Sequence, residues 1–454
     1  MRCRIIFIVI SYLLLFFNSK AQAQNHKYDL WKTPSFFRGF NVLPIVKHTL
    51  KDYNDLKATG ANLAQIGIDG FDSVNAPYDI NVNAIEATDR MVSFCDSAGI
   101  YYTITVRSGP GRRDIAIEIQ DNSLKSTIWI NQDEQKKYAK MLKDIVDRYK
   151  NDSLFVGIGP MVEPNPLFDE LNINAKMLKD KLVQDAIDLK SIYEEFVTEI
   201  RKADATLPIL IQNFQYSCPE FFAVTDTFSD KYIVYEFHSY RPLGYASNTI
   251  PNSATYPGDF ISVNDLKKIH FDKNVLDSNV FKYVDSVQNA TGRPIFLGEF
   301  GIEYEQGGGP KFLNDVYEIC IEKGWHFALW AFRPGSKDDA WDYELKSPEY
   351  WDTVLNMFKK PDYVDDNPND ASAGHLKIFP TLANDKISIH INDEKLLSLK
   401  VFDVLGNEVA DLSHYFSQAQ SEIEYNITSL PNGFYFIRLM SRKGTSVSKF
   451  IKLK

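Results

Sequence analysis

The sequence predicts an α/β fold, a (β/α)8 barrel (TIM barrel), followed by a small all-β sandwich domain. Between about residues 36 and 358, short β-branched and aromatic runs alternate with amphipathic stretches, which is typical of a parallel sheet wrapped by helices. After about residue 375 the apolar residues recur at every second position, which indicates half-buried strands. The 454 residues and 44% hydrophobic content suffice for two such domains.

The first residues have the parts of a secretory signal peptide. Two arginines precede an apolar stretch from Ile5 to Phe17, and Ala21-Gln22-Ala23 forms a small-x-small cleavage site. An uncleaved membrane anchor is the alternative, but the apolar stretch is shorter than the ~20 residues that a spanning helix needs. We therefore expect residues 1–23 to be removed and the protein to be secreted or held at the cell surface after export through the periplasm.

The strands expected in the first domain are short apolar runs bounded by turn-forming residues. They are Phe37–Val42, Ala61–Ile66, Tyr101–Val106, Leu154–Met161, Ile209–Gln212, Ile233–His238, Ile295–Gly298 and Phe327–Ala331. Eight strand-helix units are what a (β/α)8 barrel with some long loops requires, and we place this barrel at residues 24–360. A doubly wound open sheet is the alternative, but its glycine-rich phosphate loop after the first strand is missing.

The helices expected between these strands show apolar residues at three- and four-residue spacing. One helix is expected from Leu178 to Ile200. Another carries the stripe Tyr138, Met141, Leu142, Ile145, Val146 and Tyr149.

A linker and a second domain follow the barrel. Residues 361–374 are acidic and rich in Asp, Asn, Pro and small residues, which is typical of a linker. Residues 375–454 are expected to form the sandwich. Its predicted strands are Lys386–Ile391, Ser398–Phe402, Ser421–Tyr425, Phe434–Leu439 and Ser446–Leu453.

Charge and cysteine content limit the classes of ligand. The formal charge of −10, with no basic run, disfavours nucleic acid and suits a neutral ligand. Once the signal peptide is removed, Cys95, Cys218 and Cys320 remain, too few and too scattered for a disulfide framework or a thiolate metal site. The 8 His form no H-x-x-x-H ligand pair, so we expect no metal and no cofactor. A monomer is expected.

Polar side chains gather where four of the predicted strands end. Strand four ends in Met161-Val162-Glu163-Pro164, strand six in Glu236-Phe237-His238-Ser239-Tyr240, strand seven in Gly298-Glu299-Phe300-Gly301, and strand eight in Leu329-Trp330-Ala331-Phe332. In a (β/α)8 barrel these ends share one mouth, so Glu163 and Glu299 would face each other with His238 and Tyr240 between them. Two such carboxylates, one a proton donor and one a nucleophile, are what cleavage of a glycosidic bond with retained configuration needs. Glu236, Glu303 and Glu305 have no partner pattern and are expected to be supporting or solvated.

The barrel resembles glycoside hydrolase family 5, the cellulase and mannanase family. The resemblance rests on Arg38-Gly39-Phe40-Asn41, Glu163-Pro164, His238-x-Tyr240, Gly298-Glu299-Phe300-Gly301 and Trp330, in this order along about 320 residues. It implies that Glu163 is the general acid/base and Glu299 the nucleophile. It also implies that His238 and Tyr240 hold the nucleophile and the substrate, and that Trp330 forms a hydrophobic floor beneath the sugar.

Three positions depart from the family's pattern. Val162 stands where the family has an asparagine that hydrogen-bonds the sugar 2-hydroxyl, and such bonds strengthen in the transition state. Gln65 stands where an arginine usually supports the nucleophile, and Arg107 follows strand three in the place of a histidine-bearing segment. We hypothesise that Arg107 supplies the missing positive charge to Glu299. Either Arg107, Asn165 or Asn213 reaches the 2-hydroxyl, or catalysis is weakened and sugar binding is kept.

The second domain resembles the sorting domain of Bacteroidetes proteins exported by the type IX system. The matching segments are Leu399–Asp403, Leu405-Gly406, Asn432–Tyr435 and the lysine-rich end. A sugar-binding module is the alternative, disfavoured because no tryptophan follows Trp351. The sequence as a whole predicts a secreted retaining glycoside hydrolase that cleaves β-glucan or β-mannan type polysaccharides or oligosaccharides, with the type IX machinery as a partner. A binding barrel without turnover and a transglycosylase are the alternatives.

Overall fold

The structure is a computed structural model in which the chain divides into two compact units, residues 1–359 and 360–454. It describes residues 27–453 except 45–46, 122–123, 167–173, 243, 247–254, 262–266, 336–338, 360–375, 380–381, 392–395, 404–406, 417–421 and 442–443. The expected signal peptide and the expected linker lie outside the described residues. No helix in the described part of the chain has the length and apolar character needed to cross a membrane.

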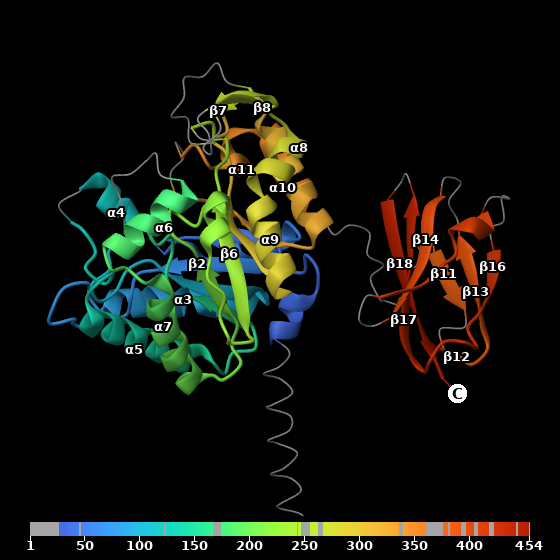
Figure 1. Cartoon of the computed structure of the whole chain (residues 1–454), viewed down its shortest axis with the longest axis horizontal. Helices are drawn as coiled ribbons and strands as arrows, with labels where there is room; N and C mark the ends of the chain where they lie inside the picture. The colour runs from blue at the N-terminus through green and yellow to red at the C-terminus, as the bar shows by residue number, and fades with distance from the viewer. Residues whose placement is uncertain are drawn as a thin grey trace, which may run out of the picture. The chain divides into compact units, whose positions relative to one another are not determined.

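Eight parallel strands close into a barrel within the described part of the first unit, which confirms the predicted fold class (Figure 1). Neighbouring strands follow the order β1-β10-β9-β6-β5-β4-β3-β2. Each expected strand begins and ends within two residues of an observed one. The observed strands are β1 Arg38–Val42, β2 Leu63–Ile68, β3 Tyr101–Val106, β4 Phe155–Gly159, β5 Ile209–Gln212, β6 Ile233–Ser239, β9 Ile295–Phe300 and β10 His326–Leu329.

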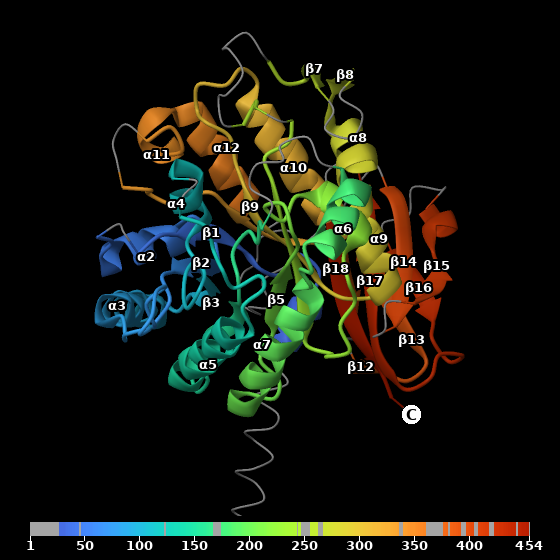
Figure 2. The same ribbon diagram turned by 60° about the vertical axis from the view of Figure 1, so that its left-hand side comes forward.

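Helices lie outside the strands (Figure 2). They are α2 Leu50–Ala58, α3 Val82–Ala98, α4 Ile115–Gln120, α5 Gln132–Tyr149, α6 Ala175–Gln184, α7 Leu189–Ala203, η1 Pro219–Val224, α8 Lys273–Val275, η2 Leu276–Val280, α9 Lys282–Thr291, α10 Gly309–Lys323, α11 Tyr343–Lys346 and α12 Pro348–Phe358. The apolar stripe expected between Tyr138 and Tyr149 is buried on α5, as predicted.

The single helix expected from Leu178 to Ile200 is wrong, because two helices, α6 and α7, occupy this stretch. Ala186 adopts a left-handed φ of 54°, which interrupts the helix. Asp188 then caps the N-terminus of α7 by accepting a hydrogen bond from the Ser191 N–H at 3.1 Å. The apolar periodicity continues across the break and therefore conceals it.

The barrel interior is apolar at one end and polar at the other. Alternate residues of β6 point inward, beginning with Val234 and continuing with Glu236 and His238. Val234 belongs to a fully buried cluster at the amino ends of the strands, whose other members are Trp31, Phe37, Leu63, Val156, Leu210, Phe296 and Ala328. The carboxyl ends of the strands are therefore left for polar side chains.

A β-hairpin is inserted between β6 and β9, and the sequence patterns did not predict it. Its strands are β7 Gly258–Ile261 and β8 Lys268–Phe271, which pair antiparallel apart from the barrel strands. Each strand has only 4 residues, so the alternation of polar and apolar residues in Lys268–Phe271 is too short to stand out from the surrounding loops.

The second unit is a sandwich, as predicted. One sheet contains β11 Leu376–Phe379, β13 Lys386–Ile391 and β16 Glu422–Asn426, and the other contains β12 Leu382–Ala383, β14 Leu396–Asp403, β15 Glu408–Asp411, β17 Gly433–Ser441 and β18 Gly444–Lys452. A 3-10 turn, η3, spans Ser413–Phe416. Residues of both sheets share one buried core, for example Ile389 of β13 and Val401 of β14.

Candidate active site

Glu163 follows β4 on a backbone that the surrounding structure holds in place. Its φ of 50° lies in the left-handed region, which residues other than glycine adopt only at a cost in free energy. Its N–H donates to Gln212 Oε1 at 2.6 Å, and the carbonyl of Val162 accepts a hydrogen bond from the buried guanidinium of Arg112. These contacts aim the Glu163 carboxylate into the barrel mouth, where 15% of the side chain remains exposed.

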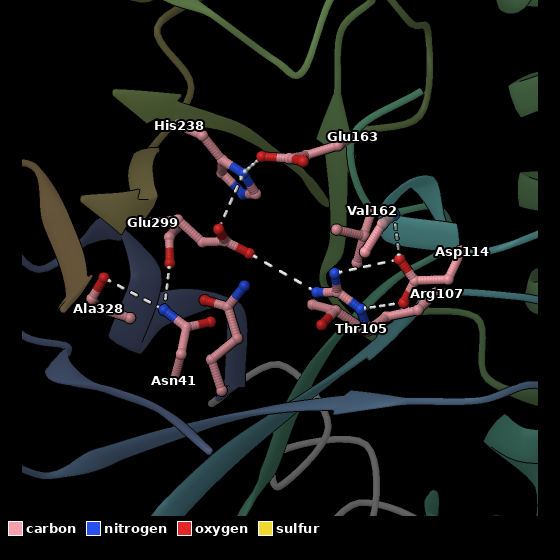
Figure 3. A network of polar contacts seen from close by, with 12 residues as sticks. Asn41, Thr105, Arg107, Asp114, Val162, Glu163, His238, Glu299 and Ala328 are labelled. Atoms are coloured by element: carbon pink, nitrogen blue, oxygen red, sulfur yellow. Dashed lines mark hydrogen bonds and ion pairs between the residues drawn. The ribbon is translucent and has the colours of Figure 1, made fainter. Parts of the chain in front are cut away.

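Glu299 lies on β9 and is more deeply buried, with 7% of its side chain exposed. The Tyr240 hydroxyl donates to Glu299 Oε2 at 3.0 Å. Asn41 on β1 donates to the carbonyl of Gly298 at 2.9 Å, which fixes the strand next to the carboxylate. Figure 3 shows the Glu299 side chain between His238 and the guanidinium of Arg107.

His238 lies between the carboxylates. Its Nδ1 is 2.8 Å from Glu163 Oε1 and 3.7 Å from Glu299 Oε2, and only 1% of the side chain is exposed. Its Nε2 is 3.4 Å from Glu236 Oε1. Both ring nitrogens therefore face carboxylate oxygens.

Glu163 and Glu299 are close enough for cleavage with retention. One oxygen of each carboxylate and one His238 nitrogen all lie within 4.8 Å of one another. Retaining glycosidases place their carboxyl groups about 5–5.5 Å apart, whereas inverting ones leave room for a water at about 6.5–9.5 Å. The spacing thus suits direct attack by a carboxylate.

The charges of this cluster shift two pKa values strongly. Burial and the charge of Glu163 raise the pKa of Glu299 to about 7, although His238, Arg107 and the Tyr240 hydrogen bond act in the opposite direction. Burial acts against a charge on His238, but the surrounding carboxylates of Glu299, Glu163 and Glu236 prevail and raise its pKa to about 10.

Arg107 follows β3 directly and reaches the Glu299 side of the site. Asp114 holds it through Nε at 2.5 Å and Nη2 at 3.3 Å, which leaves Nη1 directed at Glu299 Oε1 at 3.9 Å. Its guanidinium carbon is 5.9 Å from the ring centroid of Trp330, which is partly buried. Arg107 therefore has the orientation that our charge hypothesis requires.

Two expected sugar-binding residues have other contacts. Asn213 donates from its side-chain amide to the Phe221 carbonyl at 2.7 Å and to the Thr225 hydroxyl, which favours a structural role over contact with substrate. Asn165 is 2% exposed and hydrogen-bonds Tyr216. Val162 is also buried, and its main-chain N–H donates to the Val106 carbonyl at 3.0 Å.

Sequence reasoning missed several residues of the site. Gln212, Arg112 and Asp114 support Glu163 or Arg107, but no motif identifies them, because their partners are backbone groups or lie on a neighbouring loop. Trp341 packs edge-on against Tyr240 with the ring centroids 5.6 Å apart. A lone aromatic residue in a loop carries no signal of such a position.

The same three side chains, Glu163, His238 and Glu299, include atoms that could ligate a metal ion. An imidazole must lose its proton from the ligating nitrogen before it binds a metal. A metal ion here would therefore compete with the proton on His238, whose pKa the surrounding carboxylates raise to about 10.

The chain matches two family models. Residues 32–336 match the cellulase family (glycosyl hydrolase family 5), and residues 377–453 match the secretion system C-terminal sorting domain. Both resemblances seen in the sequence are thereby confirmed. The sorting domain indicates an exported protein, secreted or at the cell surface.

Known proteins agree with this assignment. Endoglucanase C of Acetivibrio thermocellus is 20% identical over 239 residues, which are 48% of this chain and 63% of that protein. Endoglucanase C307 of Clostridium sp. (strain F1) is 21% identical over 239 residues, again 48% and 63%. The match thus spans less than two thirds of the length of these curated relatives.

Solved structures share the fold at low identity. Endoglucanase Cel5A from Thermotoga maritima gives a TM-score of 0.53 at 16% identity, covering 73% of this chain and 99% of that chain. The cellulose synthase subunit Z of Clostridioides difficile gives 0.51 at 17% identity, covering 71% and 99%. Because the family model matches residues 32–336, which are more than half of the chain, this chain belongs to glycosyl hydrolase family 5, the cellulase family.

Proposed function

We propose that the barrel is a retaining glycoside hydrolase that cleaves β-linked glucans. The observation that carries the proposal is the approach of the Glu163 and Glu299 carboxylates to within 4.8 Å at the barrel mouth. The endoglucanase names of the relatives favour a β-glucan over a β-mannan as the substrate.

In the first step Glu299 attacks the anomeric carbon while Glu163 gives its proton to the glycosidic oxygen. The carbon–oxygen bond to the leaving sugar breaks, and a glycosyl ester on Glu299 forms. In the second step Glu163 takes a proton from water, whose oxygen displaces Glu299. The sugar is released with its original configuration, and Glu163 is protonated again.

The mechanism needs one proton on the carboxylate pair, and it needs that proton on Glu163. Two carboxylates this close share a proton, because both charges together are unfavourable. The Tyr240 hydroxyl and the Arg107 guanidinium face Glu299 and stabilise it as the ionised nucleophile, whereas His238 Nδ1 lies nearer Glu163 than Glu299. Burial acts against these two groups and raises the pKa of Glu299 to about 7, so we expect the ionised nucleophile to predominate above about pH 7.

The sugar at the cleavage point would rest on Trp330, whose ring centroid is 5.9 Å from the Arg107 guanidinium carbon. Val162 has no side-chain donor for the 2-hydroxyl, and Asp114 leaves Arg107 Nη1 directed at Glu299. Nη1 is therefore the donor that replaces the asparagine in this role. Tyr240, whose hydroxyl donates to Glu299, adds a further polar group to the site.

Val162 also favours a second candidate function, a barrel that binds β-glucan without turnover. The two functions differ in the fate of a 2-fluoro β-glucoside, which traps a working nucleophile as a stable ester. A transglycosylase would form the same ester and differ only in passing it to a sugar instead of water.

The test is sugar release from β-glucans, β-mannans and xylans by the wild type, Glu299→Ala, Glu163→Ala and the surface control Glu349→Ala. We expect release from β-glucan by the wild type and the control alone, with the 2-fluoro label on Glu299. Azide, a small nucleophile that needs no general base, should restore turnover of an activated glucoside by Glu163→Ala. Binding of β-glucan with no release and no label would refute the hydrolase and support the binding barrel.

Export would proceed through the periplasm, with the type IX machinery recognising the sorting domain. We expect the exported protein to act as a monomer. Sedimentation of the purified full-length protein tests the monomer, and its location in a strain lacking the type IX machinery tests the route.

A further inference from the structure

A third carboxylate, Glu236, lies inside the barrel close to the catalytic pair. Its side chain is fully buried on β6. Glu236 Oε1 accepts a hydrogen bond from Gln65 Nε2 at 2.8 Å and lies 3.4 Å from His238 Nε2. Its Oε2 has no hydrogen-bond partner within the described residues.

A glycine makes the space for this carboxylate. A Cβ on Gly298, the residue before Glu299, would lie 2.0 Å from Glu236 Oε1, well inside van der Waals contact. On the other side, a Cβ on Gly159 of β4 would lie 3.6 Å from Glu236 Oε2, an ordinary van der Waals contact. The absence of a side chain at Gly298 therefore admits a glutamate at position 236.

A buried carboxylate needs a compensating charge, because transfer from water costs several kcal/mol per ion. Gln65 is neutral, so among the described contacts of Glu236 the only group that can carry a positive charge is His238. The other nitrogen of His238 faces Glu163 and Glu299. With carboxylates on both nitrogens, the ring is best satisfied when both nitrogens carry a proton.

We propose that Glu236 is a positioning residue which, together with Gln65, keeps His238 doubly protonated and oriented toward Glu163 and Glu299. His238 then donates to Glu236 from Nε2 and to the catalytic carboxylates from Nδ1. This imidazolium adds a second positive charge to that of Arg107 beside Glu299, where the family usually has an arginine in place of Gln65. The catalytic consequence rests on the proposed hydrolase function, whereas the protonation state does not.

The groups around His238 come from four strands. Glu163 follows β4, Glu299 lies on β9, Glu236 lies on β6 with His238 itself, and Gln65 reaches in from β2. Arg107 is the nearby cation and acts against a second positive charge, but Asp114 pairs with it. The pKa of His238, raised to about 10, agrees with the net excess of carboxylates.

The test is an NMR titration of the full-length protein labelled with ¹³C and ¹⁵N in histidine. The ring signals of His238 are assigned from their loss in His238→Gln, and chemical shifts are followed from pH 6 to pH 11. We expect wild-type His238 to remain an imidazolium up to about pH 9, because its pKa is raised to about 10. In Glu236→Gln, which keeps the size and the contact with Gln65, we expect the His238 midpoint to fall by at least about one pH unit.

The matched control is Glu349→Gln, which makes the same charge change at an exposed site and should leave the His238 titration unchanged. A neutral His238 at pH 7 in the wild type would overturn the proposal, as would an unchanged midpoint in folded Glu236→Gln. If circular dichroism shows that Glu236→Gln does not fold, the wild-type titration alone decides.

The catalytic consequence is tested with the same variants on a soluble β-glucan. Glu236→Gln should lose kcat by about tenfold above its new His238 midpoint and much less below it, with KM little changed. A uniform loss at every pH would indicate a merely structural role and would overturn the proposed link to catalysis. If the wild type shows no turnover, the proposed hydrolase function is refuted. If His238 is nevertheless an imidazolium, the proposed role of Glu236 in its protonation still stands.

Discussion

Replacing Arg107 with methionine removes the guanidinium from Glu299, the proposed nucleophile, while keeping an unbranched apolar side chain. The pair that is lost joins Arg107 Nη1 to Glu299 Oε1 at 3.9 Å, and both side chains are largely buried. Since this cation lowers the pKa of Glu299, its removal must raise that pKa. The ionised nucleophile would then be scarce at neutral pH.

The size of the effect follows from Coulomb's law. At an effective dielectric constant of about 20, two charges this far apart interact by about 4 kcal/mol, equivalent to about three pKa units. Relaxation and water entry reduce this, so we expect a rise of about one to three units. The pKa of Glu299 starts at about 7, so the nucleophile in Arg107→Met would ionise between about pH 8 and pH 10.

The assay is kcat/KM against pH for a dinitrophenyl β-cellobioside, whose leaving group needs no proton, so that the acid limb reports Glu299 alone. Wild-type activity should rise through about pH 7, and the limb should move to higher pH in Arg107→Met. Adding Asp114→Asn should bring the limb part of the way back, because it removes the negative charge left unpaired. An unmoved acid limb in folded Arg107→Met would refute the electrostatic role of Arg107.

Three further predictions concern stability, positioning and export. The folded protein keeps the Glu299 proton up to about pH 7, whereas the unfolded chain loses it near pH 4.5. The free energy of unfolding of the wild type therefore falls as the pH rises between these two values. Glu299→Gln should therefore be more stable by up to about 3 kcal/mol at pH 8 and equal below pH 4. Urea unfolding followed by tryptophan fluorescence measures this, since all 6 Trp precede residue 352, and equal stability at pH 8 would contradict it. Gln212→Leu leaves the Glu163 N–H without its acceptor, which should cost about 1–3 kcal/mol of stability and lower kcat by about tenfold; an unchanged kcat would show that Gln212 does not position Glu163. A chain ending at residue 359 should keep its specific activity but be retained in the periplasm, and its appearance outside the cell would show that the sorting domain is dispensable.

The barrel could be predicted because its signal is local. Each strand is a short apolar run, and the buried stripe of α5 has helical spacing, so burial alone determines both patterns. The break between α6 and α7 depends instead on the left-handed Ala186 and the cap at Asp188. Such features interrupt a helix without changing its apolar periodicity.

The site could be predicted only as far as residues fall at strand ends. Glu163, His238 and Glu299 do so, and the structure brings them together. Asn213 also ends a strand, but its amide bonds its own loop, which no spacing reveals. The sequence does not determine the orientation of Arg107, because Arg107 is held by Asp114 and that pairing depends on how the loop after β3 folds back.

The glycine at position 298 links three positions that are far apart in the chain. Glu236 fits only because residue 298 has no side chain, and Gln65 is placed to bind the carboxylate that this space admits. A relative with alanine or a larger residue at 298 should therefore lack a glutamate at 236 in this position. Anyone transplanting this active site into another barrel would have to move Gln65, Glu236 and Gly298 as one set.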